Sequence, residues 1–167
     1  MYIFAIDPGN VQSAYCLMDE SLKPLKFDKV DNEELLKMME SGFPFEVHPD
    51  THFAIEMIGH YGTGMPAGKT VFDTCVWIGV FLQSHRRQTG KKGTLIMRRE
   101  EKMNLCGNMK AKDGNIRQAL IDRFGIVGTK KSPGWFYGFK ADIWQAYAVG
   151  VTYHDIYGGK TNESKSR

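Results

Sequence analysis

The sequence is poor in cysteine and has no long apolar run. Its three cysteines, Cys16, Cys75 and Cys106, are scattered along 167 residues without C-x-x-C spacing, which argues against a disulfide framework or a structural zinc site. No apolar run reaches the roughly 18 residues that a membrane span needs. The first residues also lack the charged region and apolar core of a signal peptide. We therefore expect free thiols, no membrane partner and a cytoplasmic location.

Strong net charge is also lacking, since the formal charge is only +3 at pH 7. Acidic residues nevertheless concentrate before residue 57, which leaves a basic surplus in the second half of the chain. The basic residues there fall into four groups: Arg86, Arg87, Lys91 and Lys92; Arg98, Arg99 and Lys102; Lys110, Lys112 and Arg117; Lys130 and Lys131. These groups can neutralise the phosphates of a nucleic acid, or they can form a solvated rim around helix ends.

The length and the apolar patterning predict one α/β domain. Short apolar runs bounded by turn residues predict strands, and apolar residues at three- and four-residue steps predict helices. The predicted strands span residues 2–7, 13–18, 24–30, 52–58 and 93–97. The predicted helices span residues 31–41, 69–88, 98–107, 113–125 and 141–157. We expect residues 1–157 to form the domain and residues 158–167, which lack core-forming side chains, to be a disordered tail.

Three acidic residues lie where an ordinary core would not place them. Asp7 ends the first predicted strand, Glu56 lies inside the apolar strand 52–58, and Asp142 stands at the start of the last helix. If these side chains meet at one end of adjacent strands, their oxygens form a site suited to Mg²⁺ or Mn²⁺. A pair of such ions supports in-line displacement at a phosphodiester.

Each of the three carboxylates also has an ordinary structural explanation. Asp7 precedes Pro-Gly and can accept hydrogen bonds within a turn, and Asp142 is well placed as a helix N-cap. Glu56 can pair with a buried basic group. Taken together these explanations are weaker, because Glu56 lies between Ile55 and Met57 in an apolar strand, where an unpaired carboxylate is costly.

Four segments of the chain resemble the RuvC-like Holliday-junction resolvases of the ribonuclease H-like superfamily, in particular a phage or prophage branch. The segments are "AIDPG" at residues 5–9, "AIEMI" at 54–58, the basic stretch "NMKAKDGNIRQALIDRFG" at 108–125 and "ADIWQAYAVGV" at 141–151. Their order and spacing carry the resemblance, which extends to about residue 157.

The resemblance implies an α/β ribonuclease H-like fold, with a five-stranded mixed sheet whose first three strands are antiparallel and whose faces are flanked by helices. It also implies that Asp7, Glu56 and Asp142 are catalytic metal ligands for Mg²⁺ or Mn²⁺, with two ions and no organic cofactor. Relatives show two acidic or His and acidic positions three residues apart on the last helix, whereas here Gln145 follows Asp142 at that spacing. Either Gln145 or water replaces the fourth ligand, or Asp142 is the second of the pair and Phe139 stands at the first position.

Several basic and aromatic residues are candidates for contact with DNA. By resemblance, Lys110 and Lys112 are the nearest candidates for phosphate contacts, and Arg117 belongs to the same basic group. Tyr61 follows His60 in the Gly-rich loop after the strand 52–58, where an aromatic side chain can stack on an unpaired base. His60 can carry a proton beside a metal site. Both loop residues can equally be ordinary surface side chains.

The leading hypothesis is therefore a metal-dependent endonuclease of branched DNA, a crossover junction endodeoxyribonuclease that acts as a homodimer in a bacterial or phage-infected cell. Two alternatives stay open. The chain is either another ribonuclease H-like nuclease that cuts RNA–DNA hybrids or flaps, or a catalytically weak module that binds branched DNA.

Overall fold

The five segments predicted as strands form one mixed sheet in the computed structural model, which describes residues 1–59 and 67–158. The strands are β1 (Tyr2–Asp7), β2 (Gln12–Met18), β3 (Pro24–Asp31), β4 (Thr51–Met57) and β5 (Thr94–Met97), in the order β3-β2-β1-β4-β5. β1, β2 and β3 pair antiparallel, and β1, β4 and β5 pair parallel. The predicted α/β architecture, with its antiparallel first three strands, is confirmed.

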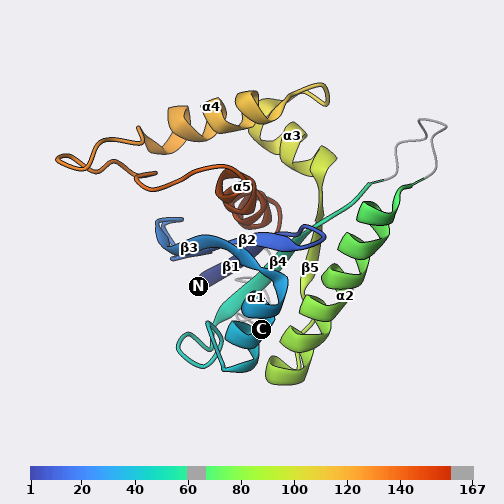
Figure 1. Ribbon diagram of the computed structural model, residues 1–167. Coiled ribbons are helices and arrows are strands. Elements are labelled where there is room, and N and C mark those ends of the chain that lie inside the picture. Colours follow the sequence, from blue (N-terminus) through green and yellow to red (C-terminus); the bar gives the residue numbers. More distant parts are fainter. Residues whose placement is uncertain (60–66, 159–167) are drawn as a thin grey trace, which may run out of the picture.

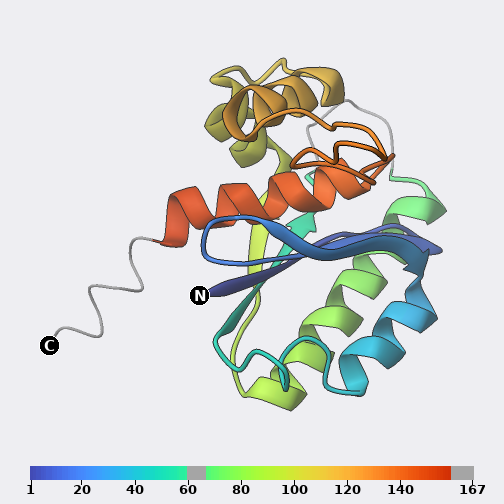
Figure 2. The same cartoon turned by 90° about the vertical axis from the view of Figure 1, so that its left-hand side faces the viewer.

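Helices cover both faces of this sheet (Figure 1). The helices are α1 (Asn32–Glu40), α2 (Lys69–Thr89), α3 (Arg98–Cys106), α4 (Asp113–Phe124), α5 (Ile143–Tyr153) and the π-helix η1 (His154–Gly158). α1 and α2 lie on one face, α5 lies on the other, and α3 and α4 form a further layer beyond α5 (Figures 1 and 2). No helix within the described ranges is long and apolar enough to span a membrane.

The sheet separates two apolar clusters, and α5 is the centre of one of them. Every residue of α5 is buried except Gln145, as expected for a helix that is covered on all sides. Gly150 allows this helix to approach the sheet closely, because a Cβ atom at this position would lie 2.3 Å from Met18 Cε and 3.2 Å from Ala5 Cβ. The position of α5 over β1 and β2 is therefore fixed by direct packing.

The last helix differs from its predicted bounds at the N-terminal end. The predicted helix begins at residue 141, but Ala141 has a positive φ of 44° and Asp142 is the N-cap of α5. A positive φ at a residue with a Cβ atom interrupts a right-handed helix. The helical path then continues through η1 as far as Gly158. The remaining residues of the predicted tail, 159–167, lie outside the described residues.

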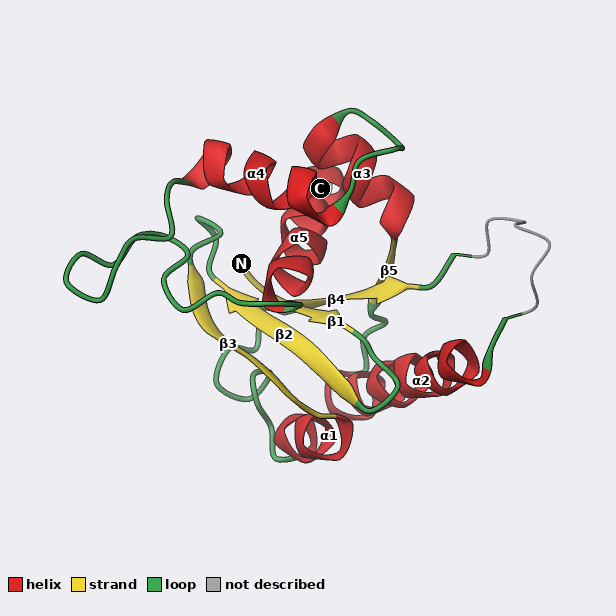
Figure 3. Ribbon diagram, turned by 45° about the horizontal axis from the view of Figure 1, so that its top comes forward, coloured by secondary structure: helices red, strands yellow, loops and turns green. Residues whose placement is uncertain are grey.

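The parallel strands bring the predicted site residues Asp7 and Glu56 to one edge of the sheet. Ile6 pairs with Ile55 in parallel register, so Asp7 and Glu56, each the next residue along, stand side by side. Met57 pairs with Met97, and Arg98 follows as the first residue of α3. The carboxyl ends of β1, β4 and β5 therefore lie on the side of the sheet where α3 and α5 are found, and β5 leads directly into α3, as Figure 3 shows.

Candidate active site

Asp7 and Glu56 form a pair of interacting carboxyl groups at the carboxyl edge of β1 and β4. Burial raises the pKa of Asp7 well above its usual value, and the negative charges of Glu56 and Asp142 raise it further. Burial also raises the pKa of Glu56, against the opposing effect of the Arg98 guanidinium. The interaction between the two side chains raises the pKa of Asp7 and lowers that of Glu56, as expected for two carboxyl groups in a confined site.

Arg98 is the cation at the centre of this edge. Its Nη1 donates to Glu101 Oε2 and to Gln145 Oε1, each at 2.6 Å, and lies 3.9 Å from Glu56 Oε2. Its Nη2 donates to Asp113. Burial would lower the pKa of Arg98, but the carboxylates of Glu101, Glu56 and Asp113 raise it above its usual value. One guanidinium thus joins β4, α3, α4 and α5.

Glu101 is a further carboxylate at this site that the sequence analysis does not identify. Its side chain is fully buried, and its Oε1 atom has no hydrogen-bond partner. Burial raises the pKa of Glu101 well above its usual value, and the charges of Glu56 and Asp7 add to that rise. Leu105, one helical turn after Glu101, packs against the apolar cluster around α5, so this face of α3 is turned toward the interior.

The third predicted ligand, Asp142, lies near Asp7 and Glu56, but its carboxylate is hydrogen-bonded to Lys29. Its charge raises the pKa of Asp7, while its Oδ2 accepts a hydrogen bond from Lys29 Nζ at 2.5 Å. Gln145, the uncertain fourth position, stands one turn further along α5 and accepts the bond from Arg98. Over residues 1–59 and 67–158, no three side chains of His, Cys, Asp or Glu form a group that could hold a metal ion.

The chemistry of the donors nevertheless fits a divalent ion. Asp7, Glu56 and Glu101 offer only carboxylate oxygens, which Mg²⁺ and Mn²⁺ favour. Burial and the charge of Glu56 raise the pKa of Asp7 and of Glu101, and a cation held by Asp7 and Glu56 would reduce this repulsion. Asp142 would be a further ligand if its carboxylate were released by Lys29.

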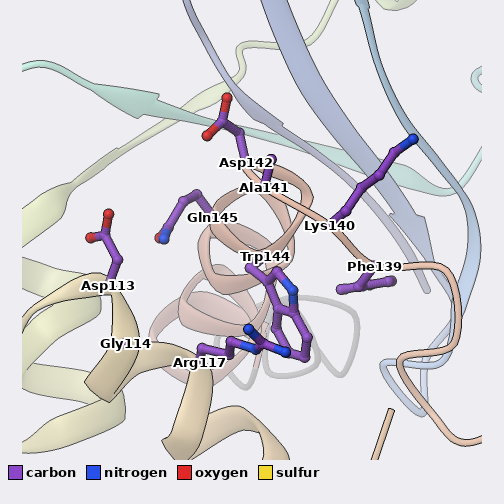
Figure 4. Close-up of a pocket in the computed structure, with 9 residues that line it drawn as sticks. All are labelled: Asp113, Gly114, Arg117, Phe139, Lys140, Ala141, Asp142, Trp144 and Gln145. Atoms are coloured by element: carbon purple, nitrogen blue, oxygen red, sulfur yellow. The ribbon is translucent and has the colours of Figure 1, made fainter. Parts of the chain in front are cut away.

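The predicted DNA-contact residues lie on the α4 side of this edge. Lys110 and Lys112 are exposed just before and at the N-cap of α4. The Arg117 guanidinium lies over the Trp144 ring, 4.8 Å from its centroid, and the two side chains line a pocket of about 550 Å³ with Asp142 and Gln145 (Figure 4). The predicted residues His60 and Tyr61 lie outside the described residues.

Comparisons with known proteins identify the fold. A scan against protein-family models finds no match, and a search of curated proteins finds none either. Solved structures do match. RuvC from Thermus thermophilus in complex with a Holliday junction substrate is 17% identical, with a TM-score of 0.68 over 96% of both chains. Another structure of Thermus thermophilus RuvC is 16% identical, with a TM-score of 0.68 over 96% of this chain and 97% of that one. The chain therefore has a RuvC-like, ribonuclease H-like fold.

The raised pKa of Asp7 predicts that this carboxyl group destabilises the protein at neutral pH when metal is absent. Because the folded-state pKa lies above the unfolded one, stability falls as pH rises from about 4 through the folded-state pKa. In a chelating buffer, Asp7→Asn should therefore unfold at a higher temperature than the wild type at pH 8. The gain should disappear near pH 4.

Thermal unfolding followed by circular dichroism from pH 4 to 8 measures this effect. Asp50→Asn, at an exposed position before β4, is the matched control and should show no such pH-dependent gain. An Asp7→Asn protein that is less stable than the wild type at pH 8 would contradict the assignment.

Proposed function

We propose that the protein is a divalent-metal-dependent endonuclease that cuts branched DNA, with the four-way junction as its substrate. One observation carries the proposal: Asp7 and Glu56 lie side by side at the carboxyl edge of two parallel strands. Burial raises the pKa of both carboxyl groups, and the charge of Glu56 raises that of Asp7 further. Perturbed carboxylates of this kind are typical of catalytic sites. The RuvC-like fold, and the Holliday junction bound in the matched Thermus thermophilus complex, support the junction as the substrate.

The proposed chemistry is hydrolysis of a phosphodiester bond. When bound, the divalent ions would make a water molecule more acidic and stabilise the charge that develops on the leaving oxygen. Asp7 and Glu56 would hold the ions at the strand ends, and Asp142, whose carboxylate accepts a hydrogen bond from Lys29, would be a further ligand. Arg98 keeps the surrounding carboxylates and Gln145 in fixed positions.

The proposed DNA path runs over the pocket beside the metal ligands. Lys140 and Arg117 line this pocket together with Asp142, so positive charge lies next to the proposed metal ligands. Lys110 and Lys112 extend the basic surface along the start of α4. Basic side chains in this arrangement position the phosphate backbone without reading its sequence.

We also propose that the active form is a homodimer. Phe72 and Val76 lie one turn apart on α2 and are 61% and 64% exposed, an apolar surface that a second copy could cover. A four-way junction has approximate two-fold symmetry, and its resolution needs two cuts. An isologous dimer places two equivalent sites about such an axis.

Cleavage assays test the proposed function directly. Labelled four-way junction, flap, duplex and RNA–DNA hybrid are incubated with the protein in Mg²⁺ or Mn²⁺. The wild type should nick the junction symmetrically, and Asp7→Asn and Glu56→Gln should each reduce the rate by at least about 100-fold while binding persists, because each removes a metal ligand. Glu40→Gln, an exposed change at the end of α1, should leave the rate unchanged.

Two results would replace this function with an alternative. Equal cutting of RNA–DNA hybrids would make the protein a different ribonuclease H-like nuclease. Junction binding without cutting in either metal would make it a binding module.

The basic residues before α4 predict a measurable dependence of junction affinity on salt. Lys110→Gln with Lys112→Gln should reduce the slope of log affinity against log salt by about 0.9 for each lost phosphate contact. Filter binding of the junction between low and moderate salt measures the slope. Lys37→Gln on α1, on the opposite face of the sheet, should keep the slope of the wild type. An unchanged slope in the double variant would remove these lysines from the interface.

A further inference from the structure

The chain between α4 and α5 forms a hairpin that extends beyond the rest of the domain (Figures 1 and 3). The backbone N–H of Thr129 donates to the carbonyl oxygen of Ser132 at 2.9 Å, and the N–H of Ser132 donates back at 3.1 Å. These two bonds close the turn of the basic hairpin, residues 127–134, and place Lys130 and Lys131 at its tip.

Two glycines allow the two sides of the basic hairpin to approach each other closely. Gly128 and Pro133 form an antiparallel bridge, and the N–H of Gly134 donates to Val127 O at 3.0 Å. A Cβ atom at Gly128, where φ is +77°, would lie 2.1 Å from Gly134 N. A side chain is therefore excluded at this position, and the backbone of the hairpin has a defined conformation.

The base of the basic hairpin is anchored in the apolar cluster around α5. The Trp135 ring stacks on Phe124 with 5.7 Å between the ring centroids, and its Nε1 donates to the Tyr147 hydroxyl at 3.1 Å. The next residue, Phe136, is fully buried. An anchored base lowers the conformational entropy that would be lost when the tip binds a partner.

The positive charge at the tip is not neutralised within the domain. Residues 124–141 contain Lys130 and Lys131 but no Asp or Glu, and both lysines are exposed. Among the described residues, neither lysine forms an ion pair. Two adjacent like charges on a projecting turn favour an anionic partner outside the domain.

α4 connects the edge that carries the candidate active site to the basic hairpin. Its first residue, Asp113, binds Arg98, and its last residue, Phe124, lies just before the hairpin. A helix of 12 residues spans roughly 18 Å. A duplex that follows α4 from Lys112 to the hairpin therefore covers about five base pairs, at about 3.4 Å for each.

We propose that the basic hairpin binds the phosphate backbone of a duplex DNA arm, about five base pairs beyond the position of Lys112. This inference rests on the proposed endonuclease function, and it adds a contact that is separate from Lys110 and Lys112. Contacts to phosphates position DNA without reading its sequence. The hairpin therefore contributes affinity for any duplex arm, and it contributes nothing to the recognition of the crossover.

Binding measured without cleavage tests this contact. A labelled four-way junction, a flap and a plain duplex are titrated with the full chain in chelating buffer. Each phosphate contact changes the slope of log affinity against log salt by about 0.9, which is about eightfold in affinity for a tenfold change in salt. Lys130→Gln with Lys131→Gln should therefore weaken binding of all three DNAs at least about fivefold at about 0.1 M salt, and reduce each slope accordingly.

Lys91→Gln with Lys92→Gln is the matched control. These lysines are also adjacent and exposed, but they lie just before β5, at the amino end of that strand. The control removes the same charge and should leave the affinities and the slopes unchanged. Circular dichroism should show that both double variants fold like the wild type, because only exposed side chains change.

Hydroxyl-radical footprinting of the junction locates the contact. The wild type should protect a stretch of backbone about five base pairs further along an arm than the stretch that Lys110 and Lys112 protect. Lys130→Gln with Lys131→Gln should lose only the distant protection, and Lys110→Gln with Lys112→Gln should lose only the near one.

The outcomes separate this inference from the proposed function. If the Lys130 and Lys131 double variant keeps the affinities and slopes of the wild type while the wild type cuts the junction, the inference is overturned and the function stands. A loss of affinity confined to the junction would place the hairpin at the crossover and would also overturn the inference. If the wild type binds none of the three DNAs, both the inference and the proposed function fall.

Discussion

Electrostatic repulsion among buried carboxyl groups is the constraint on which the arrangement of this site depends. Parallel pairing of β1 with β4 places Asp7 and Glu56 side by side, and α3 brings Glu101 within reach of both charges. Burial makes each negative charge more costly than it is in water. The guanidinium of Arg98, which is bound to Glu101 and lies 3.9 Å from Glu56, offsets part of this cost.

This constraint connects the fold to the proposed chemistry. A buried ion pair seldom contributes much net stability, because the loss of hydration offsets the attraction. The proposed metal-dependent function would give these carboxylates a role other than stability. Close packing of α5 on the sheet at Gly150 and the hydrogen bonds of Arg98 position the side chains at this edge. A catalytic site of the proposed kind would need its residues to be held in this way.

The sequence predicts the sheet, and it predicts that Asp7 and Glu56 lie close together, for identifiable physical reasons. Alternating and continuous apolar runs determine the strands, and the shared edge of parallel strands determines that Asp7 meets Glu56. Glu101 was missed because α3 reads "RREEKMN", a composition typical of an exposed helix. The hydrogen bond from Lys29 to Asp142 joins residues that are 113 positions apart in the sequence. Local sequence patterns cannot predict a contact between such distant residues. The contacts of Arg98 likewise depend on how α3, α4 and α5 pack.

The most direct measurement of the central claim is the anomalous diffraction of crystals grown with Mn²⁺. The account predicts an anomalous peak at the carboxyl edge of β1 and β4, within about 2.0–2.6 Å of carboxylate oxygens of Asp7 and Glu56, as in oxygen-ligand sites for divalent ions. It also predicts that Lys29 no longer holds Asp142. A map without a peak at this edge, with Arg98 and Lys29 still bound to the same carboxylates, would contradict the account.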